Sequence, residues 1–490
     1  MNTLYGLYCL LDINWKQNNL IKKMELTNNN SGESKGFYKL SWLQRIGFGS
    51  GDLAQNLIFQ TTCMYLLFFY TDIYGLDAVD VSVMFTVGNV ANVIWDPIVG
   101  ALIDKNNPKL GKYRAYLVFV GIPLSGFAIL CFWNGFAPSL LYAYVTYIAM
   151  TLLYTFINVP YGALNSSLTR DTNEITILTS VRMFMANCGG LAVGSGLPLL
   201  IAYFTDDVHD GLPKDPVAWF TTMTIYAVVG LVLLLFCFSQ CKEKVVMNAE
   251  ESANVKISDL WMEFFHNRPL RVIAFFFITA FAMMSIGNAA GAYFINSNMH
   301  GTSEQLSIFM GLGSAPSFIF MPLVPMIKNA VGKKNMFYIF LSVAIVGMAF
   351  LYVVAKMENP SMMYVYVAQF VKSTGVIVAT GYMWALVPEV ISYGEYVSGK
   401  RIAGIVNALT GIFFKAGMTL GSVVAPAILA YVAYDPKSIS QSPLAEEGIL
   451  WLVCVIPAAL LLLAMFIISK YELDDATIDK INKEIESRNA

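Results

Sequence analysis

The stretch Val87-Gly-Asn-Val-Ala-Asn-Val-Ile-Trp-Asp96-Pro-Ile-Val-Gly-Ala-Leu-Ile-Asp104 predicts a membrane-spanning helix that carries polar side chains within an apolar run. Asn92 and Asp96 are four residues apart. This is about one helical turn, so both side chains lie on one face. A carboxylate at membrane depth costs about 2.5–3.5 kcal/mol on insertion scales and usually faces a cavity, a partner charge or a transported ion. We interpret this face as a coupling or substrate site of a transporter, with a helix-packing hydrogen bond as the alternative.

The composition of the 490-residue chain is that of a polytopic membrane protein. Hydrophobic residues make up 57% of the chain and charged residues 13%, against about 25% charged in soluble domains. The net charge of −2 gives no reason to expect a nucleic-acid partner. The seven cysteines form no Cys-x-x-Cys pair and the three histidines fall in loops, so we expect neither a metal site nor a cofactor. No nucleophile–base set or phosphate loop is present, which argues against an enzyme.

Twelve apolar windows, each long enough to cross about 30 Å of hydrocarbon, predict an all-α membrane protein with twelve transmembrane helices. The longest polar interruption, 239–269, divides the windows six and six. We therefore expect two six-helix bundles, 45–238 and 270–469, joined by this linker, as in the major facilitator superfamily. Segments 1–44 and 470–490 are polar ends, and translation starts at either Met1 or Met24. The windows are 45–72, 79–103, 113–133, 138–164, 177–203, 217–238, 270–297, 305–328, 335–355, 361–388, 402–433 and 447–469.

Basic and acidic residues alternate between successive loops. Every second loop between the predicted helices is basic, and the loops in between are acidic or neutral. The loops 104–114 and 328–334 and the segment 239–271 are rich in Lys and Arg, whereas Asp72, Asp77 and other acids mark the alternate loops. Cytoplasmic loops carry the excess of Lys and Arg in membrane proteins. We therefore expect a multi-pass protein of the plasma (inner) membrane, with both termini cytoplasmic, that works as a monomer within the lipid bilayer.

Several segments in order carry a family resemblance. They are YLLFFYTDIYG (65–75), WDPIVG (95–100) with GKYR (111–114), YTFINVPYGAL (154–164), SVRMF (180–184), and PEVISYGE (388–395) with GKRIAG (399–404). Together they resemble the glycoside–pentoside–hexuronide:cation symporter family of the major facilitator superfamily. Within that family the chain is more similar to bacterial members of the glycoside and xyloside type than to melibiose permease.

This resemblance implies a secondary active transporter that imports a sugar or glycoside by alternating access, coupled to a cation. It also assigns residues. The family's sugar-binding aspartates fall on Asn56 and Asn158, a cation-site aspartate falls on Asn92, and an aromatic platform falls on Gly162. The implied substrate-binding residues are Asn56, Tyr154, Thr155, Asn158, Arg182, Trp384 and Lys415, and the implied cation-coupling residues are Asn92, Asp96 and Asp52.

The replacement of aspartate by asparagine changes the expected chemistry of the site. An amide still offers an acceptor and two donors to sugar hydroxyls, so Asn56 and Asn158 fit a neutral sugar or glycoside. A hexuronide is the alternative, because Arg182 and Lys415 could hold its carboxylate. Asn92 supplies oxygen without charge, and Lys415 near Asp96 would leave that pair almost neutral, so we expect proton coupling. Sodium coupling remains open.

Three further alternatives concern single residues and the overall activity. Asp52 either replaces a missing carboxylate or belongs to a gate, and Lys372 either faces the cavity or extends its long stem outward. A lysolipid-type carrier and a sugar sensor that does not transport are the competing functions. The family pattern further predicts a cytoplasmic salt-bridge gate, with solvated loop charges as the alternative, made of Asp104, Lys112, Arg114, Glu389, Glu395 and Arg401.

Overall fold

The computed structural model describes residues 39–106, 108, 110–169, 172–205, 212–243, 264–398, 403–436, 438 and 440–489. No residue of these ranges lies in a β-strand, so the predicted all-α class is confirmed for the described part of the chain. The helices of the first half are α2 (Trp42–Thr61), α3 (Ala78–Lys105), α4 (Ala115–Phe119), α5 (Gly121–Leu130), α6 (Leu140–Leu168), α7 (Thr172–Leu191), α8 (Leu197–Phe204) and α9 (Pro216–Gln240). Those of the second half are α11 (Arg268–Tyr293), α12 (Ser303–Phe320), α13 (Val324–Val331), α14 (Lys333–Ala355), α15 (Met362–Met383), α16 (Leu386–Ser398), α17 (Ala403–Tyr431), α18 (Pro443–Leu450), α19 (Ile456–Ser469) and α20 (Asp475–Asn489).

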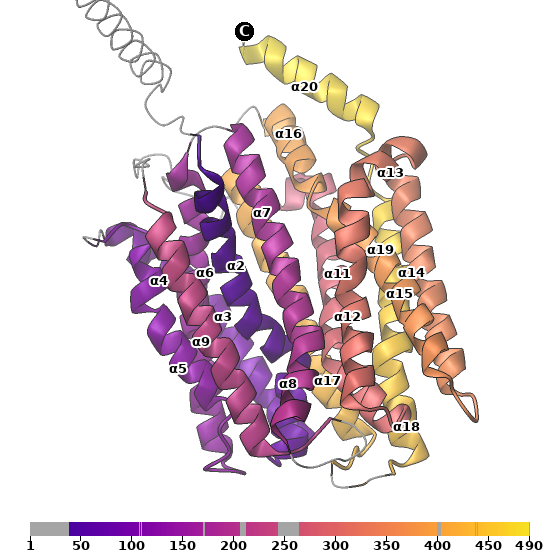
Figure 1. Cartoon of the computed structure of the whole chain (residues 1–490). Coiled ribbons are helices and arrows are strands. Elements are labelled where there is room, and N and C mark those ends of the chain that lie inside the picture. Colours follow the sequence, from indigo (N-terminus) through magenta and orange to yellow (C-terminus); the bar gives the residue numbers. More distant parts are fainter. Residues whose placement is uncertain are drawn as a thin grey trace, which may run out of the picture.

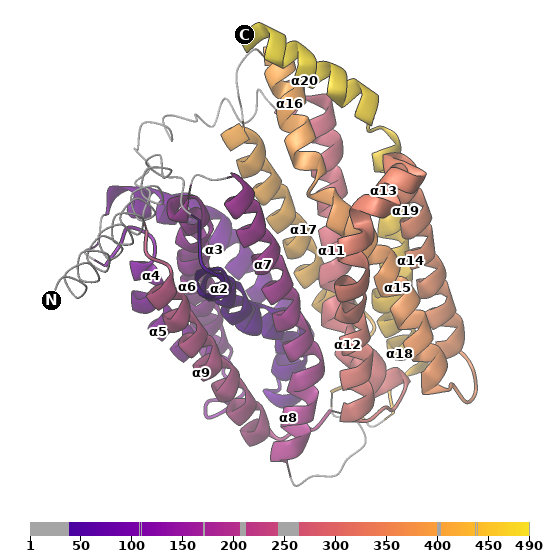
Figure 2. The ribbon, with the colours of Figure 1, turned by 45° about the horizontal axis from the view of Figure 1, so that its top comes forward.

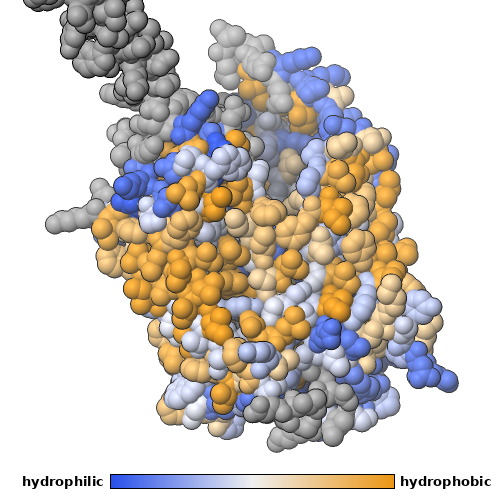
Figure 3. All heavy atoms as spheres, viewed as in Figure 1, coloured by the Kyte–Doolittle hydropathy of each residue, from blue (hydrophilic) through white to orange (hydrophobic). Residues whose placement is uncertain are grey.

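Within the described residues, ten helical stretches are long and apolar enough to cross a membrane. They coincide with ten of the twelve predicted windows. The predicted window 113–133 corresponds to the shorter apolar stretch Ala115–Leu130. On the face shown in Figure 3, hydrophobic side chains form a broad band across the middle, and hydrophilic side chains gather toward both ends. The protein is therefore a multi-pass membrane protein, while the total of twelve helices stays a prediction.

The predicted window 45–72 is helical but is not among the ten apolar stretches. A capping box starts α2, in which Ser41 and Gln44 each accept a hydrogen bond from the backbone N–H of the other. The helix continues through π-helical turns, Thr62–Leu66 and Phe69–Ile73. Polar residues in a membrane helix usually face protein or a cavity, so α2 is expected to line the site. These residues are Asp52, Gln55, Asn56 and Gln60.

The helices fall into two groups, with α2–α9 on one side and α11–α19 on the other (Figures 1 and 2). At the boundary, α3 lies beside α17, and α7 lies beside α12. We call the groups the first-half and second-half helices. The division predicted at 239–269 stays a prediction, because residues 244–263 lie outside the described ranges.

The two groups meet closely along these seams. The Ser195 hydroxyl donates to the Ser307 carbonyl oxygen at 3.0 Å, and the Ser307 hydroxyl donates to the Ser195 carbonyl oxygen at 2.6 Å. Between α3 and α17, Ser82 donates to the carbonyl oxygen of Val423 at 3.2 Å. Small residues allow helix backbones to approach in this way. Reciprocal hydrogen bonds between short side chains and backbone therefore fix the register of the two groups.

The tail predicted as 470–490 contains a helix that the sequence analysis missed, α20, which lies across one end of the bundle (Figure 1). Ile481 packs into the core with 5% exposure. Asp475 pairs with Lys328 at 2.6 Å and with Lys333 at 3.3 Å. The hydrogen bond from Lys328 lowers the pKa of the Asp475 carboxyl below its usual value. We call this end of the bundle the α20 face, and the other end the opposite face.

Packing of α14 against α15 gives a prediction about stability. A Cβ atom on Gly375 would lie 2.4 Å from both the Ala344 nitrogen and the Phe340 carbonyl oxygen, whereas a Cβ on Gly126 would meet no atom within 4 Å. We expect Gly375→Ala to lower the free energy of unfolding by about 1–3 kcal/mol, because backbone atoms must move. The control Gly126→Ala should behave like the parent protein. Thermal denaturation in detergent measures both, and equal midpoints for the two variants would contradict the packing.

Candidate functional site

An ion pair joins the two halves at the predicted cation site. Lys415 of α17 donates from Nζ to Oδ2 of Asp96 on α3. The side chains are partly exposed, at 39% for Lys415 and 26% for Asp96. The other carboxylate oxygen of Asp96, Oδ1, is buried and has no hydrogen-bond partner among the described residues. An unpaired buried carboxylate oxygen is uncommon in proteins.

Asn92 lies one turn from Asp96 and faces α6. Its side-chain carbonyl oxygen accepts a hydrogen bond from the Thr155 hydroxyl at 3.4 Å. The structure thus brings Asn92, Asp96, Thr155 and Lys415 to one region between α3, α6 and α17. Asp52, the third residue implied in cation coupling, has a different partner.

Asp52 on α2 forms an ion pair with Arg182 on α7. The guanidinium donates from Nε to Oδ2 at 2.5 Å and from Nη2 to Oδ1 at 3.3 Å. The Tyr161 hydroxyl donates to the Phe48 carbonyl oxygen at 2.6 Å and reaches Oδ2 of Asp52 at 3.2 Å. The guanidinium carbon also lies 4.8 Å from the centre of the Tyr161 ring. The charge of Arg182 is therefore compensated within the first half.

Amide side chains of α2 and α6 line a polar wall. The exposed Asn158 donates from Nδ2 to Oε1 of Gln55 at 3.3 Å. Asn56 donates to the backbone oxygen of Asp52 at 2.9 Å, which leaves its own carbonyl oxygen to accept from Gln60 at 3.3 Å. At Gly162, where the family has an aromatic residue, a Cβ atom would meet nothing within 4 Å. The wall therefore presents neutral amides beside open space.

The second half contributes an aromatic wall. Trp384, at the end of α15, is 44% exposed. Its ring centre lies 4.9 Å from that of Phe277 and 6.3 Å from that of Phe414, and Phe281 completes the group. Aromatic rings suit the apolar C–H faces of a sugar, whereas amide groups suit its polar hydroxyls.

A cavity of about 130 Å³ lies between the halves, with walls from α2, α3, α6, α11 and α17. Of the residues implied in substrate or cation binding, only Asn92 and Tyr154 line it. The Phe59 and Tyr154 rings stack at 5.5 Å along its wall. Residues that the sequence analysis did not single out also line this cavity, among them Thr62, Asn89, Thr151, Ser285 and Ser422.

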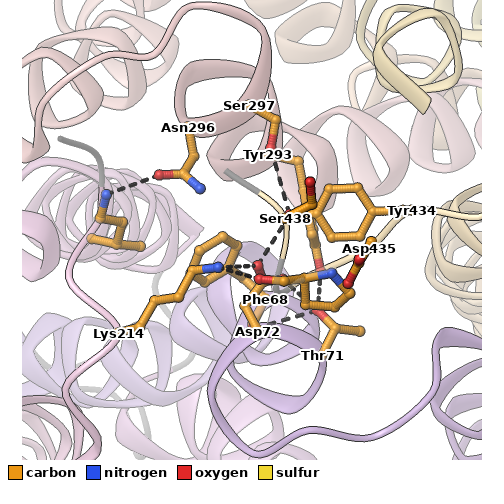
Figure 4. Close-up of polar contacts among 12 residues, drawn as sticks. Phe68, Thr71, Asp72, Lys214, Tyr293, Asn296, Ser297, Tyr434, Asp435 and Ser438 are labelled. Atoms are coloured by element: carbon orange, nitrogen blue, oxygen red, sulfur yellow. Dashed lines mark hydrogen bonds and ion pairs between the residues drawn. The ribbon is translucent and has the colours of Figure 1, made fainter. Parts of the chain in front are cut away.

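A buried acid ties the halves together at the opposite face (Figure 4). Asp72, with 0% side-chain exposure, accepts at Oδ1 from Nζ of Lys214 at 3.0 Å and from the Tyr434 hydroxyl at 3.0 Å. Thr71 donates to its Oδ2 at 2.8 Å. Asp72 and Lys214 belong to the first half and Tyr434 to the second, so this cluster holds the opposite ends of the two groups together.

Further contacts surround Asp72. The hydroxyls of Thr71 and Tyr293 are 2.7 Å apart, and Lys214 also donates to the backbone oxygen of Pro436 at 2.6 Å. Burial, with the neighbouring Asp72, raises the pKa of Tyr434, so its hydroxyl remains a donor. We call this cluster the Asp72 closure; its members are Thr71, Asp72, Lys214, Tyr293 and Tyr434.

The residues of the predicted gate contact their own halves at the α20 face. Glu243 accepts from the backbone N–H groups of Lys112 at 2.9 Å and of Arg114 at 2.8 Å. Glu389 accepts from Nζ of Lys333 at 2.7 Å. None of these three contacts crosses between the halves.

Three other gate residues add little to this picture. Glu395 is half-buried. The side chain of Asp104 and the whole of Arg401 lie outside the described residues. The gate as a unit stays a prediction.

Comparison with known proteins identifies the family of this chain. The model of a family described as MFS/sugar transport protein matches residues 47–475. The chain belongs to this family. A protein of Bacillus subtilis (strain 168), named Uncharacterized symporter YnaJ, is 40% identical over 460 residues, which are 93% of this chain and 97% of the relative. The MFS/sugar transport family consists of membrane transporters, and this member is a transporter rather than an enzyme.

Other members of the family carry more specific names. The glucuronide carrier protein homolog of Escherichia coli (strain K12) is 28% identical to this chain. The alignment covers 92% of this chain and 96% of the relative. The isoprimeverose transporter of Lactiplantibacillus pentosus is 28% identical, and the alignment covers 84% of this chain and 86% of the relative. A crystal structure of a D-xylose-proton symporter superposes with a TM-score of 0.62 at 16% identity, over 88% of this chain and 97% of that one. This likeness shows the shared fold.

Sequence reasoning missed the Asp72 closure and the Asn89–Ser422 hydrogen bond of 2.9 Å between α3 and α17. The sequence analysis identified Asp72 only as an acidic loop residue within the segment YLLFFYTDIYG (65–75). Lys372 lies inside the second half with Nζ 5.8 Å from the Phe309 ring centre, and it does not line the cavity.

The Asp52–Arg182 pair leads to a prediction about stability. Asp52→Asn leaves a partly buried guanidinium without its counter-charge, which should lower the free energy of unfolding by about 3–5 kcal/mol. The double variant Asp52→Asn with Arg182→Gln removes both charges and should be more stable than the single variant. Thermal denaturation in detergent compares them. A double variant less stable than Asp52→Asn alone would contradict this account.

The Asp72 closure leads to a prediction about access. Cys63 lines the cavity, so its alkylation reports how often the opposite face opens. Asp72→Asn weakens the charge-assisted hydrogen bonds of Lys214 and Tyr434, and we expect a membrane-impermeant maleimide, added on that side, to label Cys63 several-fold faster. Asp77→Asn, an exposed acid at the same face, is the control. Unchanged labelling in Asp72→Asn would show that the closure does not hold this face shut.

Proposed function

We propose that the protein is a secondary transporter that carries a neutral sugar or glycoside together with a proton. The observation that carries the proposal is the Asp96–Lys415 ion pair between the halves, with Oδ1 of Asp96 buried and unpartnered. Protonation of Asp96 removes the attraction that holds Lys415. A proton can therefore decide whether α3 and α17 stay joined at this point.

Proton coupling fits the charges of this region better than sodium coupling does. Sodium prefers several oxygen ligands with excess negative charge, as hard cations do. Asp96 is already neutralised by Lys415, and Asn92 adds oxygen without charge. A sodium ion would have to compete with Nζ of Lys415 for the same carboxylate, whereas a proton needs only one oxygen.

The paired cations favour a neutral substrate over an acidic one. Arg182 is bound to Asp52, and Lys415 is bound to Asp96. A hexuronide would have to displace a carboxylate to reach either cation. Neutral hydroxyls can instead bind the amides of Asn56 and Asn158 while the sugar packs near Trp384. Relatives are named for both an acidic substrate, a glucuronide, and a neutral one, isoprimeverose.

The proposed cycle uses the two faces in turn. The Asp72 closure seals the opposite face while the site opens toward the α20 face. The α20 face carries Arg268, Lys328 and Lys333. Cytoplasmic sides of membrane proteins are rich in such residues, so we assign the α20 face, with the C-terminus, to the cytoplasm of the inner membrane. In this orientation the described state would release substrate inward.

Uptake into proteoliposomes tests the proposal. Labelled neutral and acidic glycosides are offered with an imposed pH gradient, or with a sodium gradient at fixed pH. We expect accumulation driven by the pH gradient. Equal stimulation by sodium alone would overturn proton coupling. If glycosides bind but none of them shows counterflow, the protein is a sugar sensor that does not transport. If lysolipids compete with the glycosides, a lipid carrier is favoured.

Removing the charge of Asp96 should separate transport from coupling. Asp96→Asn keeps the shape of the side chain but cannot be protonated in this pH range, so we expect loss of accumulation driven by the pH gradient. Counterflow of the same sugar should persist at a measurable rate. Asp80→Asn, at the start of α3, serves as the matched control and should keep both activities. Accumulation that survives in Asp96→Asn would contradict the proposed role.

The reverse change should create a sodium response. Asn92→Asp places a second carboxylate one turn from Asp96 and adds the negative charge that a hard cation needs. We expect uptake by this variant to become stimulated by sodium at fixed pH, in contrast to the parent protein. A variant that transports but shows no sodium response would contradict the charge argument.

A further inference from the structure

We propose that the cavity between the halves binds the apolar aglycone of a glycoside whose sugar ring occupies the amide-lined region beside it. The inference rests on the proposed function and narrows its substrate class to glycosides with an alkyl or aryl group. Among the residues that the family resemblance implies in substrate binding, only Tyr154 lines this cavity.

The position of the cavity defines where such a group would lie. Asn92 lines its wall, and Asp96 is one turn further along α3 toward the α20 face. Leu67 lines its other end, one turn from Thr71 of the Asp72 closure. The cavity is therefore the dead end of the site while the opposite face is closed. A substrate that enters it must have an end without charge.

The serine and threonine hydroxyls of the wall already donate their protons to the backbone. Each donates to a backbone carbonyl oxygen: Thr62 to Ile58 at 3.0 Å, Thr151 to Ile148 at 3.0 Å, Ser285 to Met418 at 3.1 Å and Ser422 to Thr419 at 2.9 Å. Asn89 is joined to the Ser422 hydroxyl. A sugar ring placed here would leave hydroxyls poorly compensated, which is unfavourable in a buried site. An apolar group has no such requirement.

The remaining walls are apolar and come from both halves. The side chains of Phe59, Leu67, Phe85, Met150, Ala289 and Met418 surround the cavity. Tyr154, which lines the cavity, is one turn from Asn158 on α6, and Asn92, which also lines it, accepts a hydrogen bond from Thr155. A glycoside could thus keep its hydroxyls near Asn158 and its aglycone among the apolar side chains. Such a ligand contacts α6 and α11 together and so favours the state in which the halves are closed around it.

The test compares paired ligands on the purified full-length protein. Methyl and 4-nitrophenyl glycosides of xylose, glucose and galactose are measured by thermal shift and by inhibition of counterflow. We expect the nitrophenyl compound of each glycone that binds to be about 10-fold or more tighter than the methyl compound, from burial of the ring. 4-Nitrophenol alone controls for unspecific adsorption and should not compete.

A substitution in the cavity wall tests whether the preference for nitrophenyl glycosides arises in this cavity. Ala289→Leu fills the cavity from α11 and should reduce the nitrophenyl-to-methyl ratio to about one, while affinity for the methyl glycoside stays within about 2-fold. Ala149→Leu adds the same bulk beside the cavity-lining Met150 but does not line the cavity, and it should keep the parent ratio.

The outcomes separate this inference from the proposed function. Equal affinity of the paired glycosides in the parent protein overturns the aglycone site and leaves sugar transport intact. Equal weakening of both ligands in Ala289→Leu, with Ala149→Leu unaffected, overturns it as well, because the sugar ring itself would then occupy the cavity. Binding of no glycoside at all overturns the proposed function and the inference together.

Discussion

The arrangement of the helices depends on compensation of charge at membrane depth, and above all on the attraction between Asp96 and Lys415. An uncompensated charge in this region would cost several kcal/mol. Asp52 with Arg182 and Asp72 with Lys214 satisfy the same requirement within the first half. Among the described residues, Asp96–Lys415 is the ion pair that crosses from one half to the other. Its charge state therefore bears on how the halves sit together.

The contacts between the halves are unevenly distributed, and this asymmetry has a functional meaning. Hydrogen bonds across the boundary run from the Asp72 closure through Ser82 and the Ser195–Ser307 pair. At the α20 face, ion pairs such as Arg45–Glu174 and Lys333–Glu389 stay within one half. Alternating access requires states in which the halves are joined at one end at a time, and among the described residues the Asp72 closure joins them at the opposite face. The serine seams are short and reciprocal, so they can act as the region about which the halves tilt.

The sequence predicts the helical class and most spans well, because apolar runs of this length have few alternatives in a membrane. Asp96 stands out in the sequence because charged residues are rare inside spans, whereas Lys415 was implied by the family resemblance. The sequence does not predict which charged side chains form ion pairs with each other. The alternative of an acidic sugar assumed that Arg182 is available to a carboxylate, but Asp52 binds it, and that contact depends on the packing of α2 against α7. The Asp72 closure and α20 were missed because their partners are distant in sequence and their residues are ordinary loop or tail residues.

The exchange of acids for amides explains how these features belong together. With Asn at 56, 92 and 158, the site keeps Asp52 and Asp96 and balances each with one cation. A neutral ligand can then enter without disturbing any ion pair, and the hydroxyls of its sugar find amides that both donate and accept. In the proposed cycle, this ion pair breaks when Asp96 gains a proton or when Lys415 moves away. Because α17 carries Lys415 and α3 carries Asp96, either event would act on the helices that border the cavity, so the proposal links the proton, the ligand and the movement of the halves through one carboxylate.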